Sequence, residues 1–134
     1  MYPRNMRIGE VAVRTGLSLR TIRYYEESGL VAPSALSQGG LRLYTESDAA
    51  RLMIIRRMTP LGFSLDEMRV LLAITDRLDG EEPPTADDRD QLLRRVGEFE
   101  RATAERVADL RSQLVGAEEF AAMLRERIAR FVHV

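Results

Sequence analysis

The chain has 134 residues, a formal net charge of −1, 45% hydrophobic residues and no cysteine. This length fits one ordinary domain or a small domain with an appendage, and the absence of cysteine excludes disulfides and thiolate metal sites. No apolar run approaches the roughly 18 residues of a membrane span, and the first residues lack the apolar stretch of a signal peptide, so we expect a cytoplasmic protein.

The charges are distributed unevenly along the chain. Residues 1–60 hold nine Arg and five acidic residues, whereas residues 61–134 hold eleven Arg and sixteen acidic residues. The first part therefore carries +4 and the second −5. This asymmetry favours a nucleic-acid-binding head followed by a tail with a different role.

The segment Arg7–Leu17 predicts a short amphipathic helix. One stripe of apolar or small residues recurs at helical spacing and is expected to face a core: Ile8, Val11, Ala12 and Thr15. Gly16 then ends the helix and allows a tight turn.

The segment Ser18–Gly29 predicts a second short helix. Ser18 is a good N-cap residue, and Gly29 suits a left-handed exit. On a helical projection the inner side holds Leu19, Ile22 and Glu26, and the outer side holds Arg20, Arg23, Tyr24 and Glu27.

Two guanidinium groups and a phenol on the outer side of a short helix suit the DNA major groove. The alternative is a solvated helix face whose Arg residues pair with Glu26 and Glu27. A short helix, a Gly-containing turn and a second helix with a basic outer side together favour a helix-turn-helix that binds DNA.

A β-hairpin is predicted after this pair of helices. Gly39 and Gly40 can supply the positive φ angles of a hairpin turn, and Leu41–Tyr44 alternates as a short strand does. Such a hairpin would be a wing, with Arg42 placed to reach a phosphate. An ordinary surface loop is the alternative.

Two further helices are predicted to brace the head. Thr45–Asp48 resembles a capping box that opens a helix through about Thr59, and Ser64–Glu67 resembles a second one. We expect the first helix to be largely buried and the second to carry one apolar stripe, so that the two form a compact hairpin.

The segment Leu78–Thr85 predicts a linker, because it contains Gly, two Pro and three acidic residues. The remainder contains no Pro and predicts one long helix, with Gly116 as a position where it could instead break into a hairpin. From Val107 onward its apolar or small residues recur in alternating steps of three and four, which is a heptad seam. The seam includes Val107, Leu110, Leu114, Leu124 and Ile128.

A long helix cannot bury such a seam on itself, so a partner helix is needed, most economically from a second copy of the chain. We therefore predict a mainly α fold: a winged helix-turn-helix head over residues 1–77, a linker over 78–85, and a dimerisation coiled-coil helix over 86–134 that forms a homodimer.

The stretch IGEVAVRTGLSLRTIRYYEESGLVAP, followed by GGLRLYTESDAARLMIIRRMTPLGFSLDEMRVLL, resembles the MerR family of bacterial transcription regulators. The resemblance covers residues 7–77, and the tail looks like the antiparallel dimerisation coil of that family. Two positions depart from it, since family members commonly have Arg where Leu36 stands and Tyr where Leu41 stands.

The resemblance implies a homodimer that binds double-stranded DNA at a pseudo-palindromic promoter with a long spacer. Bending and untwisting of the spacer would let RNA polymerase read both promoter elements, so the polymerase would be an indirect partner. The residues that match the family's DNA-binding positions lie in the second helix, Ser18–Gly29, and in the wing: Arg20, Thr21, Arg23, Tyr24, Arg42 and Tyr44. Tyr25 matches as well, although we expect it to lie partly in the core, and Ser18 completes the predicted DNA-binding set.

Other functions remain as alternatives. An architectural or excisionase-like DNA-binding protein would share the head, and a coiled-coil partner of another regulator would share the tail. The chain has no catalytic constellation that we recognise, so we expect neither an enzyme nor a cofactor. The effector, the target promoter and the sign of regulation stay open.

Overall fold

The computed structural model describes residues 5–33, 35–36 and 39–132. The chain divides into two compact units between Leu93 and Arg94. The first unit contains the helix-turn-helix and a small sheet, and the second contains most of the long last helix. Among the described residues, no helix has the length and apolarity needed to cross a bilayer.

The helix-turn-helix consists of α1 (Ile8–Thr15) and α2 (Leu19–Glu27). Val11 and Thr15 of α1 are buried, as the predicted stripe requires. The Thr15 hydroxyl donates a hydrogen bond of 2.8 Å to the carbonyl of Val11, which removes the cost of burying it. Gly16 ends α1 with a φ of +73°, a left-handed conformation that favours glycine.

A three-stranded antiparallel sheet follows the order β1-β3-β2, with β1 at Met6–Arg7, β2 at Ala35–Leu36 and β3 at Arg42–Tyr44. The hairpin β2–β3 is the predicted wing, and Gly40 before β3 has a φ of +77°. Strand β1 was not expected, because we predicted that Arg7 begins the first helix. The middle strand is β3, since Met6 pairs with Tyr44 on its other side.

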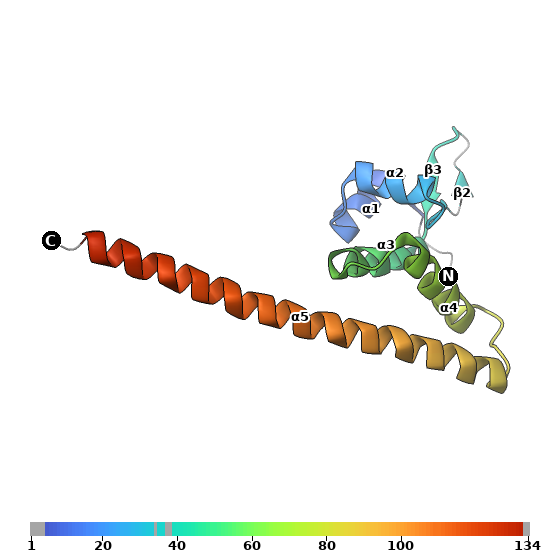
Figure 1. The fold of residues 1–134 in the computed structure, drawn as a ribbon. Coiled ribbons are helices and arrows are strands. Elements are labelled where there is room, and N and C mark those ends of the chain that lie inside the picture. Colours follow the sequence, from blue (N-terminus) through green and yellow to red (C-terminus); the bar gives the residue numbers. More distant parts are fainter. Residues whose placement is uncertain (1–4, 34, 37–38, 133–134) are drawn as a thin grey trace. The chain divides into compact units, whose positions relative to one another are not determined.

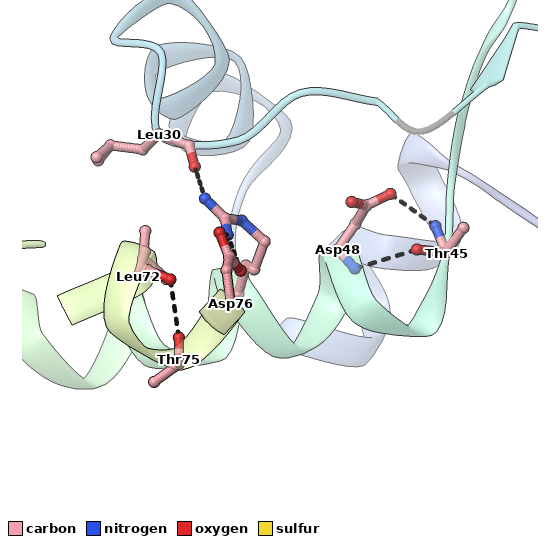
Figure 2. Close-up of polar contacts among 7 residues, drawn as sticks. Leu30, Thr45, Asp48, Leu72, Thr75 and Asp76 are labelled. Carbon is pink, nitrogen blue, oxygen red and sulfur yellow. Dashed lines mark hydrogen bonds and ion pairs between the residues drawn. The ribbon is translucent and has the colours of Figure 1, made fainter. Parts of the chain in front are cut away.

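Two helices brace this head: α3 (Glu46–Met58), which continues into a 3₁₀ turn at Thr59–Leu61, and α4 (Leu65–Asp79). Both predicted capping boxes are present. Figure 2 shows the capping box at α3. The Asp48 carboxylate accepts a hydrogen bond of 2.8 Å from the Thr45 amide, and the Asp48 amide donates a hydrogen bond to Thr45 Oγ1.

The Arg51 guanidinium joins three elements of the head. It donates a hydrogen bond of 2.9 Å to the Leu30 carbonyl, which follows α2, and it forms an ion pair with Asp76 of α4. The two acceptors lie close together in Figure 2. Because a guanidinium carries several donors in a fixed fork, one side chain can hold both groups at once.

The last helix, α5 (Ala86–Val132), is continuous through Gly116, so the alternative hairpin is not formed (Figure 1). Thr85 precedes it, and its Oγ1 accepts a hydrogen bond of 3.2 Å from the Asp88 amide. Helix α4 extends to Asp79, two residues into the stretch that we expected to be a linker. At 1.5 Å per residue, α5 is roughly 70 Å long.

Candidate nucleic-acid interface

The start of α2 is fixed by the N-cap that the sequence predicts. Ser18 Oγ accepts a hydrogen bond of 3.1 Å from the Thr21 amide and donates one of 2.8 Å to Thr21 Oγ1. Because Thr21 Oγ1 accepts the Ser18 proton, its own proton remains available to an acceptor on the surface. The cap therefore orients two hydroxyl groups at the front of the helix.

The two sides of α2 are divided largely as predicted. Ile22 is buried, and the outer side exposes Arg20, Arg23, Tyr24 and Glu27. Leu19, which we expected on the inner side, is 44% exposed. It is the first residue of the helix, so the inner stripe begins at Ile22.

The guanidinium groups on this side are not neutralised by their own helix. Within the part of the chain that the structure describes, no carboxylate forms an ion pair with Arg20 or Arg23. Glu26 instead forms an ion pair with Arg42 of the wing. The alternative of a solvated face with internal Arg–Glu pairs is therefore not what the structure contains.

Two of the residues predicted to bind DNA lie in the core. Tyr44 is completely buried, and Tyr25 is 6% exposed. The Tyr25 hydroxyl lies 3.0 Å from Thr59 Oγ1, which itself donates to the Ile55 carbonyl, so Tyr25 is the donor. Tyr25 thus ties α2 to the end of α3, and neither ring belongs to the exposed surface.

Tyr44 was assigned to DNA binding only because it matches the wing position of the family that the sequence resembles, and its burial depends on a strand that was not predicted. In the structure Tyr44 pairs with the buried Met6 of β1, which covers that part of the strand. The wing therefore exposes Arg42 and Leu41, while Tyr44 anchors its base.

A cleft of about 750 Å³ opens between the recognition helix and the wing. Three guanidinium-bearing residues line it, from β1, α2 and β3 respectively: Arg7, Arg23 and Arg42. Glu26 and Glu27 line it as well, and the Glu26 side chain is only 7% exposed. The cleft thus combines a basic lining with one largely buried carboxylate.

Two further Arg residues support the helix-turn-helix, and the sequence had marked neither as part of it. Arg56 of α3 lies against the turn, since a Cβ atom on Gly16 would be 3.3 Å from its guanidinium carbon. Arg14 of α1 forms an ion pair with Glu46 of α3. The hydrogen bond to Glu46 and its negative charge raise the pKa of Arg14 above its usual value.

The predicted seam residues of α5 are largely exposed to solvent in the single chain. Val107 is half-buried, while Leu110, Leu114, Leu124 and Ile128 are 43–62% exposed. An apolar seam of this kind marks a helix that packs on another helix.

Together, α1, α2 and the hairpin form a winged helix-turn-helix with a basic outer surface, which is an architecture of DNA-binding proteins. Comparison with known families agrees. Residues 6–73 match the profile described as "MerR HTH family regulatory protein", and residues 49–127 match the profile described as "MerR, DNA binding".

Curated relatives point to the same family. The chain is 41% identical to the HTH-type transcriptional regulator ZntR of Escherichia coli (strain K12), over 74% of this chain and 69% of that protein. It is 35% identical to the HTH-type transcriptional regulator CueR of Salmonella typhimurium, over 85% of this chain and 80% of that one.

Solved structures share the fold. The transcription regulator PbrR691 from Ralstonia metallidurans CH34, in complex with lead(II), is 32% identical with a TM-score of 0.51 over 82% of this chain and 83% of that one. HiNmlR, a MerR family regulator bound to promoter DNA, has a TM-score of 0.63 at 21% identity, over 83% and 79% of the two chains. This chain belongs to the MerR family and is a DNA-binding transcription regulator of that type.

Proposed function

We propose that the chain acts as a homodimer that places two recognition helices on the two halves of a pseudo-palindromic promoter. The observation that carries this proposal is the long α5 helix, whose exposed seam needs a partner of matching length. A second copy of the chain supplies that partner, and an antiparallel pair of such helices would carry one head near each end.

The residues proposed to contact DNA are the exposed ones of the helix-turn-helix and the wing: Ser18, Arg20, Thr21, Arg23, Tyr24 and Arg42. Arg20 and Arg23 lie on the outer side of α2, where a major groove would receive them. Arg42 extends the surface to a phosphate beside the groove. Tyr25 and Tyr44 support this surface from the core, so we leave them out of the contact set.

Regulation follows from a fixed separation of the two heads. If the paired helices set a distance that the straight promoter spacer does not match, binding must bend or untwist the spacer. RNA polymerase would then meet the two promoter elements in a new register, and no direct contact with the regulator is needed. The protein would work in the cytoplasm, at the nucleoid, without catalysing a reaction.

The test is footprinting of the purified chain on the DNA upstream of its own coding sequence, combined with copper/phenanthroline cleavage of the spacer. We expect a protected region with two symmetric halves and enhanced cleavage at its centre, because distorted minor grooves react faster. A protected region without symmetry would contradict the dimer, and an undistorted centre would contradict regulation through spacer geometry.

A further inference from the structure

The ion pair between Glu26 and Arg42 connects the recognition helix to the wing, and its two members differ in exposure. The Glu26 side chain is 7% exposed, whereas that of Arg42 is 57% exposed. Glu26 therefore belongs to the floor of the cleft between α2 and the wing, and Arg42 lies over it. Salt screens a largely buried charge much less than an exposed one.

Among the described residues, the Glu26 carboxylate has no hydrogen-bond or ion-pair partner other than Arg42. Its Oε2 atom pairs with Arg42, and its Oε1 atom is buried and accepts no hydrogen bond within the described part of the chain. Burying a carboxylate with only one oxygen satisfied is costly. Arg42 is thus the group that balances the Glu26 charge.

Three more charged groups face the same cleft. Arg7 of β1 and Arg23 of α2 line it, and Glu27 lines it from the next position on α2. Glu27 is exposed and forms no ion pair among the described residues. Glu26 and Glu27 are therefore adjacent carboxylates on one helix, of which only Glu26 engages the wing.

We propose that Glu26 restrains Arg42 from general phosphate binding, so that the wing contributes its charge only on a DNA site that positions a phosphate for it. This inference rests on the proposed function in one respect, namely that Arg42 faces DNA. On a mixed-sequence duplex, Arg42 stays paired with Glu26 and releases no counterion. On the cognate site, a well-placed phosphate displaces the carboxylate from the exposed guanidinium, and the cost of leaving Glu26 unpaired is what prevents a poorly placed phosphate from doing the same.

The test uses the full chain and measures the salt dependence of its affinity for a fluorescent mixed-sequence duplex. Each phosphate that a protein neutralises contributes about −0.9 to the slope of log K against log salt. Glu26→Gln keeps the shape of the side chain and removes its charge, so we expect the slope to steepen by about one contact. The ratio of the affinity of Glu26→Gln to that of the wild type should therefore fall about 3.5-fold between 50 and 200 mM salt.

Glu27→Gln is the matched control, because it removes the same charge from the neighbouring residue without releasing Arg42. Equal slopes for Glu26→Gln and Glu27→Gln would overturn the proposal. So would weaker binding by Glu26→Gln, since that would mean that Glu26 positions Arg42 for DNA and does not restrain it.

Arg42→Ala separates this inference from the proposed function and remains informative if Glu26→Gln does not fold. We expect it to leave the slope on the mixed-sequence duplex unchanged and to reduce the slope on the upstream DNA by about one contact. An equal reduction on both duplexes would refute the restraint but keep the wing contact. No reduction on either would refute the wing contact itself. In the double variant Glu26→Gln/Arg42→Ala, the steepening should disappear.

Discussion

Gly16 has two separate reasons to be a glycine. Its φ of +73° lies in the left-handed region, and an added Cβ atom would meet the Arg56 guanidinium at 3.3 Å. Gly9, the second residue of α1, has neither constraint, since an added Cβ there would meet nothing within 4 Å. Gly9 and Gly16, at the two ends of α1, therefore make a matched pair.

We expect Gly16→Ala to lower the free energy of unfolding by about 1–2 kcal/mol, the cost of placing an L-residue in a left-handed conformation. Gly9→Ala should instead raise it by about 0.5–1 kcal/mol, because alanine is the better helix former. Urea denaturation of both variants measures the difference. If the two substitutions had the same sign, the turn would not depend on this backbone geometry.

Arg20 lies near the start of the recognition helix and, among the described residues, forms no ion pair with a carboxylate. We expect Arg20→Ala to reduce discrimination between the preferred DNA site and single-base variants of it by roughly 1–3 kcal/mol, if Arg20 reads a base edge. Competition binding against a panel of such duplexes measures this. Arg130→Ala, which removes the same charge from α5, serves as the control. Uniform weakening across the panel would assign Arg20 to a phosphate.

At the scale of elements, the features that could be predicted are those formed by residues close together in the sequence, above all the starts of helices. The caps at Ser18, Thr45 and Ser64 are local hydrogen bonds between residues three apart, so short motifs were enough to place the starts of α2, α3 and α4. Strand β1 has only two residues, too few to show any periodicity. The burial of Tyr44 against Met6 of β1 could therefore not be predicted either.

Ion pairs between residues far apart in the chain could not be predicted, because no short motif contains both partners. The pairs Arg14–Glu46 and Glu26–Arg42 join side chains 32 and 16 residues apart, and each carboxylate has several other Arg residues as plausible partners. Only the packing of the helices selects among them. The exposed side of α2 was therefore predicted from the sequence, whereas the charge pairs around it were not.

The apolar seam of α5 can be tested by placing charges on it. Leu110→Asp with Leu114→Asp should convert the proposed dimer to monomers, because it would place like charges along the apolar seam. Light scattering at micromolar concentration measures the outcome. Ser112→Asp with Val115→Asp adds the same charge to other exposed positions of α5 and should leave a dimer. A dimer that survives the first pair would show that the seam is not the interface.

At the scale of the whole molecule, the charge asymmetry matches the division of labour between head and tail. Three Arg residues of the first part, Arg7, Arg23 and Arg42, line the cleft between α2 and the wing, while the long helix carries mixed charges beside its apolar seam. The uneven charge, the short basic helix and the heptad spacing each predicted one part of the same design. The proposed homodimer, which would read two half-sites, would need all three.

The fork of Arg51 has a mechanical consequence. The Arg51 guanidinium of α3 connects the Leu30 carbonyl, three residues beyond the end of α2, to the Asp76 carboxylate of α4, so a displacement of α4 would act through Arg51 on the segment that follows α2. A lysine at this position would have a single ammonium in place of the guanidinium, so it would hold the Leu30 carbonyl and the Asp76 carboxylate together less rigidly. Any movement of α4 would therefore bear on α2, the helix that we propose to enter the major groove.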